Sequence, residues 1–334
     1  MRVLSPTVRK TITPCLEVLP TALPDDPNKL RHAASELARN VGRSWGTDPL
    51  YVDLSYIQQG LCAEDGEHIL SLLASAAAEY HIKPIFTVWL YQNEPFKTAA
   101  ADAVHIQDLG AAIRLNYVDL DKSDIAVGLN ALVSRLGLTR ASTDVFVECG
   151  IIDDNNPPDY DWLCSRIPNI GDWRRFAVSG GAFPRDLMAF SVGRRTQPRY
   201  EWLHWQSWAL APKLESTRIP EFSDYTIQHA VFHEPPPGAN PSASIRWAAE
   251  TYWVIMRGQA LRRKTKQGAA ANQYRANAQL LSEFEEFSGP HFSFGDRYVW
   301  EVANKLTGPG TPATWITAGV ARHITVSSHQ VASL

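Results

Sequence analysis

Ala111-Ala-Ile-Arg-Leu-Asn116 and Asp144-Val-Phe-Val-Glu-Cys149 decide the fold, together with the segment that joins them. Both are short apolar runs with the length of buried β-strands. The joining segment, residues 123–136, has the start signal Ser123 and the stop signal Gly137 of an α-helix. A strand, a helix and a second strand in this order predict two parallel strands connected by a crossover helix.

The same alternation runs through the first two thirds of the chain. Further helices are expected at residues 28–41, 64–80, 96–104 and 160–167, and further strands at residues 12–18, 51–56, 84–90, 175–180, 199–208 and 227–232. About eight strands without any Gly-x-Gly-x-x-Gly motif favour an α/β fold of the closed, TIM-like (βα) barrel type over a doubly wound sheet.

The regular alternation ends at Phe232, where a Pro-rich segment, residues 233–241, begins. We therefore expect residues 1–232 to form the barrel domain and residues 233–334 to form an α-rich C-terminal extension packed on it. Within the extension, helices are expected at residues 272–287 and 296–306, an edge strand or hairpin at 315–326, and either a strand or a helix at 244–261.

The Trp-rich run Arg199-Tyr-Glu-Trp-Leu-His-Trp-Gln-Ser-Trp208 has polar and apolar residues on both faces if it is extended. Burying such a strand is costly unless its polar groups find partners. The run is therefore a core strand with satisfied polar groups, a strand that opens into a polar pocket, or an aromatic patch for a partner.

Composition narrows the protein class. With 45% hydrophobic and 20% charged residues, the chain is typical of soluble globular proteins. A net charge of -3 gives no support for nucleic-acid binding, and the basic run at residues 262–266 is better explained as a solvated loop.

No apolar run approaches the roughly 20 residues that cross a bilayer, and there is no signal-peptide core. We expect a cytoplasmic protein with four reduced cysteines, no membrane contact and no cysteine-based metal motif.

The strand ends supply the candidate catalytic residues. In a TIM-like barrel, chemistry is built at the carboxyl ends of the strands, and there the sequence places Glu17, Asp53 and Glu148, with Arg114 as a binding residue. The acids suit an acid and base pair, or oxygen ligands for Mg²⁺ or Mn²⁺. Because no HxH motif lies near these strand ends, we expect no metal, and the cofactor stays open. Capping a loop or pairing with an arginine is an equally good account of any single acid.

Several short motifs resemble the beta family of phage and prophage proteins: Ile12-Thr-Pro-Cys-Leu-Glu17, Val52-Asp53, Ile113-Arg114-Leu115, Arg199 to Trp205, Phe222-Ser-Asp-Tyr225, Arg257-Gly258, Phe294-Gly-Asp296, Trp315 and His323. The resemblance implies a (βα) barrel and an association with mobile elements and antiphage modules. Besides the strand-end residues Glu17, Asp53 and Arg114, the resemblance implies further positions of a ligand site: Trp202, Trp205, Asp224, Tyr225, Asp296, Trp315 and His323.

The chain departs from that family at its start. Members usually begin with a further strand and helix, of the form Tyr-x-Pro-x-Leu-Lys, whereas residues 1–10 here resemble the tail of that helix. By the resemblance, the barrel would then be incomplete at the N-terminus.

Two functions are compatible with these features. The first is a cytoplasmic component of a phage-defence or toxin-control module, which binds a protein encoded by a neighbouring gene or a small anionic ligand at the barrel mouth. The second is a barrel hydrolase acting on an anionic substrate, for example one that bears phosphate. In it, Arg114 holds the anion, and the acids at the strand ends serve as acid, base or metal ligands. Acids converging in a cavity would favour a small ligand or a reaction, and exposed tryptophans would favour a protein partner.

Overall fold

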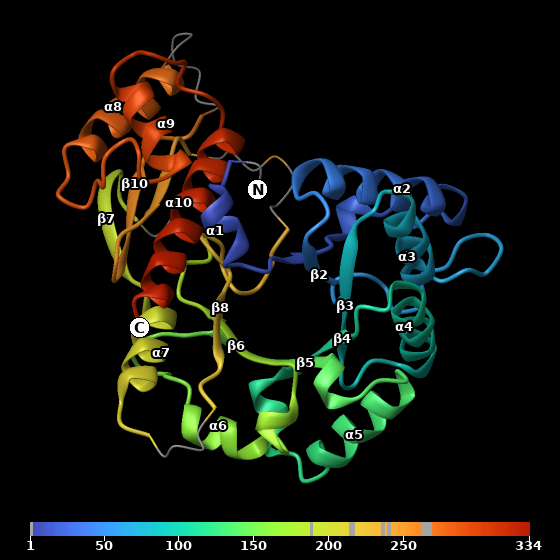
Figure 1. Cartoon of the computed structure of the whole chain (residues 1–334). Coiled ribbons are helices and arrows are strands. Elements are labelled where there is room, and N and C mark those ends of the chain that lie inside the picture. The colour runs from blue at the N-terminus through green and yellow to red at the C-terminus, as the bar shows by residue number, and fades with distance from the viewer. Residues whose placement is uncertain (1–2, 188–189, 214–217, 235–237, 239–241, 262–268) are drawn as a thin grey trace.

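The computed structural model describes residues 3–187, 190–213, 218–234, 238, 242–261 and 269–334. Its larger part is a seven-stranded parallel sheet with strand order β1-β2-β3-β4-β5-β6-β8, curled into a half-barrel (Figure 1). The strands are β1 (Cys15–Glu17), β2 (Pro49–Asp53), β3 (Lys83–Trp89), β4 (Ala111–Asn116), β5 (Thr143–Ile151), β6 (Arg175–Gly181) and β8 (Glu221–Asp224).

Helices cover the convex face of this sheet (Figure 1). They are α2 (Pro27–Ser44), α3 (Ile69–Glu79), α4 (Glu94–Gln107), α5 (Ile125–Arg135), α6 (Tyr160–Arg166) and α7 (Tyr200–Leu210), with 3-10 turns η1 (Pro20–Ala22), η2 (Tyr117–Asp121), η3 (Arg140–Ser142) and η4 (Ile170–Asp172). Alternate strand residues such as Val52, Ile113 and Val147 join the core beneath the helices. The residues between them, which include Tyr51 and Phe146, line the concave face.

The sequence located six of the eight expected strands and all five expected helices of this part, with shifted ends. The closed barrel is not what the structure shows: among the described residues, the sheet ends at β1 on one side and β8 on the other, and no pairing joins these two edges. The fold is an α/β half-barrel.

Two predicted strands were wrong. Residues 199–208 lie mostly in α7, because Trp202 and Trp205, three positions apart, share one helical face and pack against Phe222 of β8. Residues 227–232 form turns and bends and no strand. The last strand of the sheet is instead β8, which sequence periodicity did not single out as a strand.

The second part of the molecule is a three-stranded antiparallel sheet with strand order β7-β10-β9, covered by three helices (Figure 1). Its elements are β7 (Gly193–Pro198), β9 (Ile245–Ala248), β10 (Tyr252–Arg257), α8 (Ala269–Ser282), α9 (Phe294–Ala303) and α10 (Pro312–Ala332). Residues 244–261, for which the sequence left strand and helix open, contain β9 and β10. The edge strand or hairpin expected at 315–326 was wrong, since α10 includes these residues and buries Trp315, Ala318 and Arg322 along one face.

The terminal helices lie at the open side of the half-barrel (Figure 1). Helix α1 (Pro6–Lys10) contacts α10, with Val8 packed near Ala321 and Ile324. Thr11, just after α1, is hydrogen-bonded to Ser328, with 2.6 Å between their hydroxyl oxygens. Helix α10 therefore faces the concave side of the sheet and forms a wall opposite it.

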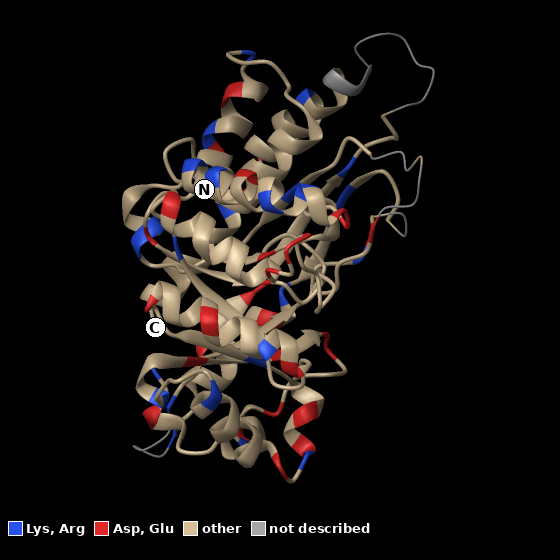
Figure 2. Ribbon diagram, turned by 90° about the vertical axis from the view of Figure 1, so that its right-hand side faces the viewer, with Lys and Arg blue, Asp and Glu red and all other residues tan. Residues whose placement is uncertain are grey.

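Charge is mixed over the molecule. Figure 2 shows Lys and Arg interspersed with Asp and Glu along the helices and loops. Within the described ranges, every helix is too short or too polar to cross a lipid bilayer.

Candidate functional site

The half-barrel and α10 enclose a cavity of about 1040 Å³. One wall carries strand residues, among them Glu17, Arg114 and Glu148, and the opposite wall carries His323 and Ser327 of α10. The volume is that of a small-molecule site. The cavity is thus the place in the described structure where chemistry-bearing side chains and ligand-sized space coincide.

Arg114 is the centre of the polar groups in this cavity. Its guanidinium lies 2.8 Å from Asp53 Oδ2, 2.7 Å from Glu148 Oε1 and 3.3 Å from Glu17 Oε1, and the side chain is only 4% exposed. The ring of Trp89 lies 4.8 Å from the guanidinium carbon. Parallel strand pairing brings these carboxylates together, because β1 and β2 place Glu17 beside Asp53 in register. Residues far apart in the chain thereby share one cation.

Asp53 is the buried member of the group. It accepts hydrogen bonds from the Ser55 amide at 2.7 Å, from Trp89 Nε1 at 3.2 Å and from the Thr87 hydroxyl. Burial opposes ionisation, but the charge of Arg114 and these hydrogen bonds outweigh it and lower the pKa of Asp53. Asp53 is therefore a fixed anion that holds Arg114 in place.

Glu17 differs from Asp53 in its environment. Its side chain is 25% exposed and faces the cavity. Burial raises the pKa of Glu17, Asp53 and Glu148 raise it further, and the attraction of Arg114 does not offset these effects. The two neighbouring carboxyl groups of Glu17 and Asp53 thus have pKa values displaced in opposite directions, and of the two only Glu17 lines the cavity.

Tyr225 completes the group from the loop after β8. Its hydroxyl donates a hydrogen bond to Glu148 Oε2 and lies 3.4 Å from Arg114 Nη2. Burial, followed by the charge of Glu148, raises the pKa of Tyr225, so the phenol stays protonated and acts as a donor. Both oxygens of Glu148 are thereby oriented, one by Arg114 and one by Tyr225.

A second polar group lies on the α10 side of the cavity. His323 Nε2 is 2.7 Å from Asp224 Oδ2, and the His323 side chain is 1% exposed. Burial lowers the pKa of His323 and favours the neutral ring, although Asp224 opposes this shift. Ser327 Oγ lies 3.5 Å from the same Nε2. A serine nucleophile needs its histidine to contact serine and aspartate through opposite nitrogens, so these residues do not form a catalytic triad.

Sequence reasoning missed two buried charges next to this group. Arg199 is completely buried and donates to Ser327 Oγ at 2.9 Å and to the Ala249 carbonyl at 3.1 Å. Glu201 lies 3.6 Å from Arg199, and burial raises the pKa of Glu201 to about 8. The Trp-rich run contained both residues, but only its helical form turns Glu201 inward.

The remaining expected ligand positions are dispersed. Asp296 pairs with Arg322 at 3.0 Å, and Trp315 stacks on Tyr274 with ring centres 5.4 Å apart; neither lines the cavity. Trp202 is fully buried in the main core. Trp205 is 5% exposed and borders the cavity. The three tryptophans thus do not form an exposed aromatic patch.

The basic run at residues 262–266 lies outside the described residues. Arg194 pairs with Glu286 at 2.8 Å, and Arg199 is buried, so Arg199 is not on a surface that nucleic acid could reach.

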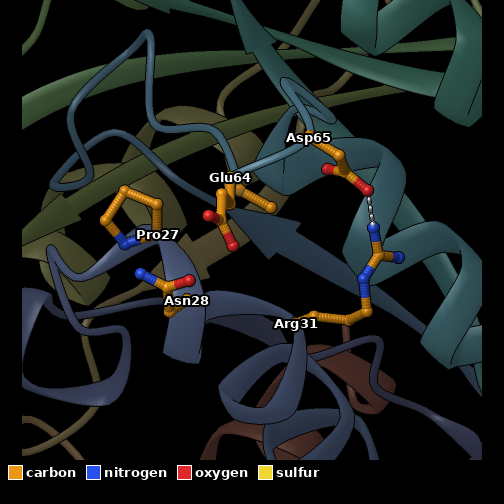
Figure 3. A pocket seen from close by; sticks show the side chains of 6 residues that line it. Pro27, Asn28, Arg31, Glu64 and Asp65 are labelled. Atoms are coloured by element: carbon orange, nitrogen blue, oxygen red, sulfur yellow. Dashed lines mark hydrogen bonds and ion pairs between the residues drawn. The ribbon is translucent and has the colours of Figure 1, made fainter.

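Other pockets and clusters in the described ranges are less informative. A surface pocket at the start of α2 is lined by Pro27, Asn28, Arg31, Ala63, Glu64 and Asp65 (Figure 3). Arg31 there is paired with Asp65 at 2.6 Å and with Glu67 at 2.8 Å. Among the residues with described side chains, no group of three or more His, Cys, Asp and Glu could hold a metal ion.

Comparisons with known proteins identify a family. No curated protein matches the chain. One solved structure with some likeness is a GH138 enzyme targeting pectin rhamnogalacturonan II, with a TM-score of 0.29 and 12% identity over 50% of this chain and 26% of that one. The chain thus spans about a quarter of that enzyme, and a likeness this weak decides neither fold nor function. A family model described as Beta protein matches residues 1–329, which is nearly the whole length. The chain belongs to the Beta protein family.

Proposed function

We propose that the protein binds a small ligand in the half-barrel cavity and hydrolyses it by acid and base catalysis. The observation that carries this proposal is the meeting of Glu17, Glu148 and Arg114 at a ligand-sized cavity. A cavity with convergent titratable groups supports a reaction or small-ligand site. The burial of Trp202 and Trp205 gives no comparable support to a tryptophan-based protein interface.

In this proposal Glu17 donates the proton to the leaving group, because burial shifts its pKa toward the protonated form and its side chain reaches the cavity. Glu148 acts as the carboxylate that takes a proton from the attacking water, held in place by Arg114 and Tyr225. Arg114 is a positioning residue. Its guanidinium is already bound to three carboxylates, which leaves it poorly placed to hold an anionic substrate.

We propose the cellular setting on the basis of the family. The protein would act in the cytoplasm, in a phage-defence or toxin-control module of a mobile element, together with a protein from a neighbouring gene. Membership of the Beta protein family supports this setting. Binding without a reaction is the alternative, and it predicts the same ligand with no turnover.

The test is a hydrolysis screen of the full chain against chromogenic phosphate esters, glycosides and amides. We expect turnover of one class, lowered at least a hundredfold in both Glu17→Gln and Glu148→Gln. The matched control is Glu221→Gln, a cavity residue at the other end of the sheet that is 52% exposed and pairs with Arg175.

Turnover that survives in both variants would refute the assigned roles. A cavity ligand found by thermal shift that is never turned over would instead favour the binding alternative.

A further inference from the structure

Two of the four arginines that line the cavity have no ion-pair partner among the described residues. Arg114 and Arg175 are paired with carboxylates, whereas Arg185 and Arg246 are not. Arg246, on β9, is half-buried, and burial lowers the pKa of Arg246 with no neighbouring carboxylate to oppose the shift. A desolvated guanidinium without an anion is unfavourable unless something else compensates it.

The local contacts orient Arg246 but leave donors free. Its Nη1 donates to the Ile227 carbonyl at 2.9 Å and to Gln228 Oε1 at 3.0 Å, and the guanidinium carbon lies 5.0 Å from the centre of the Phe183 ring. Nε and Nη2 have no hydrogen-bond partner in the described part of the chain. The guanidinium is thus fixed through one nitrogen and presents the N–H groups of two further nitrogens, Nε and Nη2, which form the fork that binds oxyanions.

Two histidines also line the cavity. His229 and His233 line it with ring centres 5.7 Å apart. Burial lowers the pKa of His233, and the positive charges of Arg185 and His229 lower it further, which reflects their proximity. The acids Glu17, Glu148 and Asp224 are already engaged by Arg114 or His323. Arg185 and Arg246 are therefore the cavity-lining arginines without a paired carboxylate among the described residues.

We propose that Arg246, with Arg185, His229 and His233, forms a subsite for an oxyanion of the cavity ligand, a phosphate or a carboxylate. This subsite rests on the proposed function in one respect: the anion is taken to be part of the same molecule on which Glu17 and Glu148 act. Recognition of the anion and proton transfer would then be divided between two groups of residues in one cavity. Arg114, the expected anion clamp, would have no part in binding the anion.

The test is a calorimetric titration of the full chain with inorganic phosphate. Sodium chloride is added so that the ionic strength stays constant. A parallel titration with acetate distinguishes a carboxylate site from a phosphate site. We expect saturable binding of one anion, weakened about tenfold or more in Arg246→Met, since a hydrogen bond to a charged group is lost. Arg297→Met, on an exposed arginine of α9, is the matched control and should bind as the wild type does.

His233→Gln guards against misfolding of the first variant, because His233 is exposed and its replacement leaves the core intact. We expect it to weaken binding severalfold. Equal affinity in Arg246→Met, His233→Gln and wild type, or no binding of either anion, overturns the subsite.

Glu148→Gln separates the two proposals, since it should abolish turnover and leave anion binding unchanged. Anion binding through Arg246 without any turnover would keep the subsite and reject the proposed reaction.

Discussion

At the scale of single residues, Arg114 and Glu201 show two different ways of burying charge. Arg114 is surrounded by three carboxylates and a tyrosine hydroxyl, so its positive charge has ample compensation. Both Glu201 oxygens are buried without a hydrogen-bond partner in the described structure, and the nearest cation is 3.6 Å away. The neighbouring carboxylates therefore favour the ionised form of Arg114 and raise its pKa against the effect of burial, whereas burial favours the protonated form of Glu201.

Replacing Arg114 should destabilise the fold. Arg114→Met leaves Glu17, Asp53 and Glu148 facing each other without a cation, which typically costs about 3–5 kcal/mol. Urea unfolding at pH 7 measures this loss. Arg135→Met, on an exposed pair with Glu94, is the control and should cost at most about 1 kcal/mol. Equal losses in the two variants would mean that the cluster contributes no more than a surface pair.

Glu201 should make the protein less stable as the pH rises. Its pKa is raised from the ordinary 4.5 to about 8, so its stabilising contribution is complete below pH 4.5 and is lost as pH rises through 8. Glu201→Gln imitates the protonated form. We expect the two proteins to match near pH 5 and the variant to be more stable by a few kcal/mol near pH 9.

Chemical unfolding across this pH range, with Glu221→Gln as the exposed control, provides the measurement. Parallel pH profiles for wild type and Glu201→Gln would show that Glu201 ionises normally in the folded chain.

At the scale of elements, α10 connects the two parts of the molecule. One side of it packs on β9, and other residues of the same helix line the cavity. The close approach requires a glycine: a Cβ at Gly319 would lie 2.6 Å from the Arg246 carbonyl oxygen and 2.8 Å from Ile227 Cδ1. The position of α10, and with it the width of the cavity, therefore depends on this contact.

Gly319→Ala should push α10 away from β9. Overpacking of this kind costs about 1–3 kcal/mol, and the shift should also weaken anion binding, because Arg246 carries the contacted carbonyl. Thermal unfolding and the phosphate titration measure both effects. The control is Gly308→Ala, where an added Cβ meets nothing within 4 Å. If Gly319→Ala is as stable as the wild type, α10 and β9 are packed more loosely than the structure indicates.

At the scale of the whole molecule, the cavity exists because a curled sheet, whose β1 and β8 edges are not joined by any described strand, is faced by a helix from the C-terminal end of the sequence. The concave face is apolar at one level, with Tyr51, Ile85, Ala112, Phe146 and Ala177 in contact. It is polar at the next level, around Arg114. Ligand-sized space beside fixed charges is a property of this assembly, because no single strand or helix supplies both.

Filling the cavity should abolish function without unfolding the protein. Ser223→Trp, on β8 and in the cavity wall, places an indole where a ligand would lie. We expect loss of turnover and of anion binding, with a melting temperature changed by only a few degrees. Ser134→Trp, on the exposed face of α5, is the control. Retained turnover in Ser223→Trp would place the site outside this cavity.

Sequence periodicity predicted the local structure of the half-barrel well where runs were long and uniform. The pairing of strand ends predicted that Glu17, Asp53, Glu148 and Arg114 would lie together, because the pleat and parallel register are local rules. Sequence periodicity failed for the Trp-rich run and for residues 315–326. There, mixed polar and apolar residues fit both a strand and a helix, and the partner surface decided between them.

The sequence by itself determined the alternation of strands and helices and the acids at the strand ends, because these depend on neighbours a few residues apart. The tertiary structure alone decided that the sheet stays open, that α10 faces its concave side, and that Glu201 turns inward. It also decided that Arg246 reaches the cavity without an ion-pair partner among the residues that the structure describes. Burial and charge compensation depend on contacts between residues far apart in the chain. Such long-range contacts include the one between Thr11 and Ser328, 317 positions apart, and short-range patterns carry no information about them.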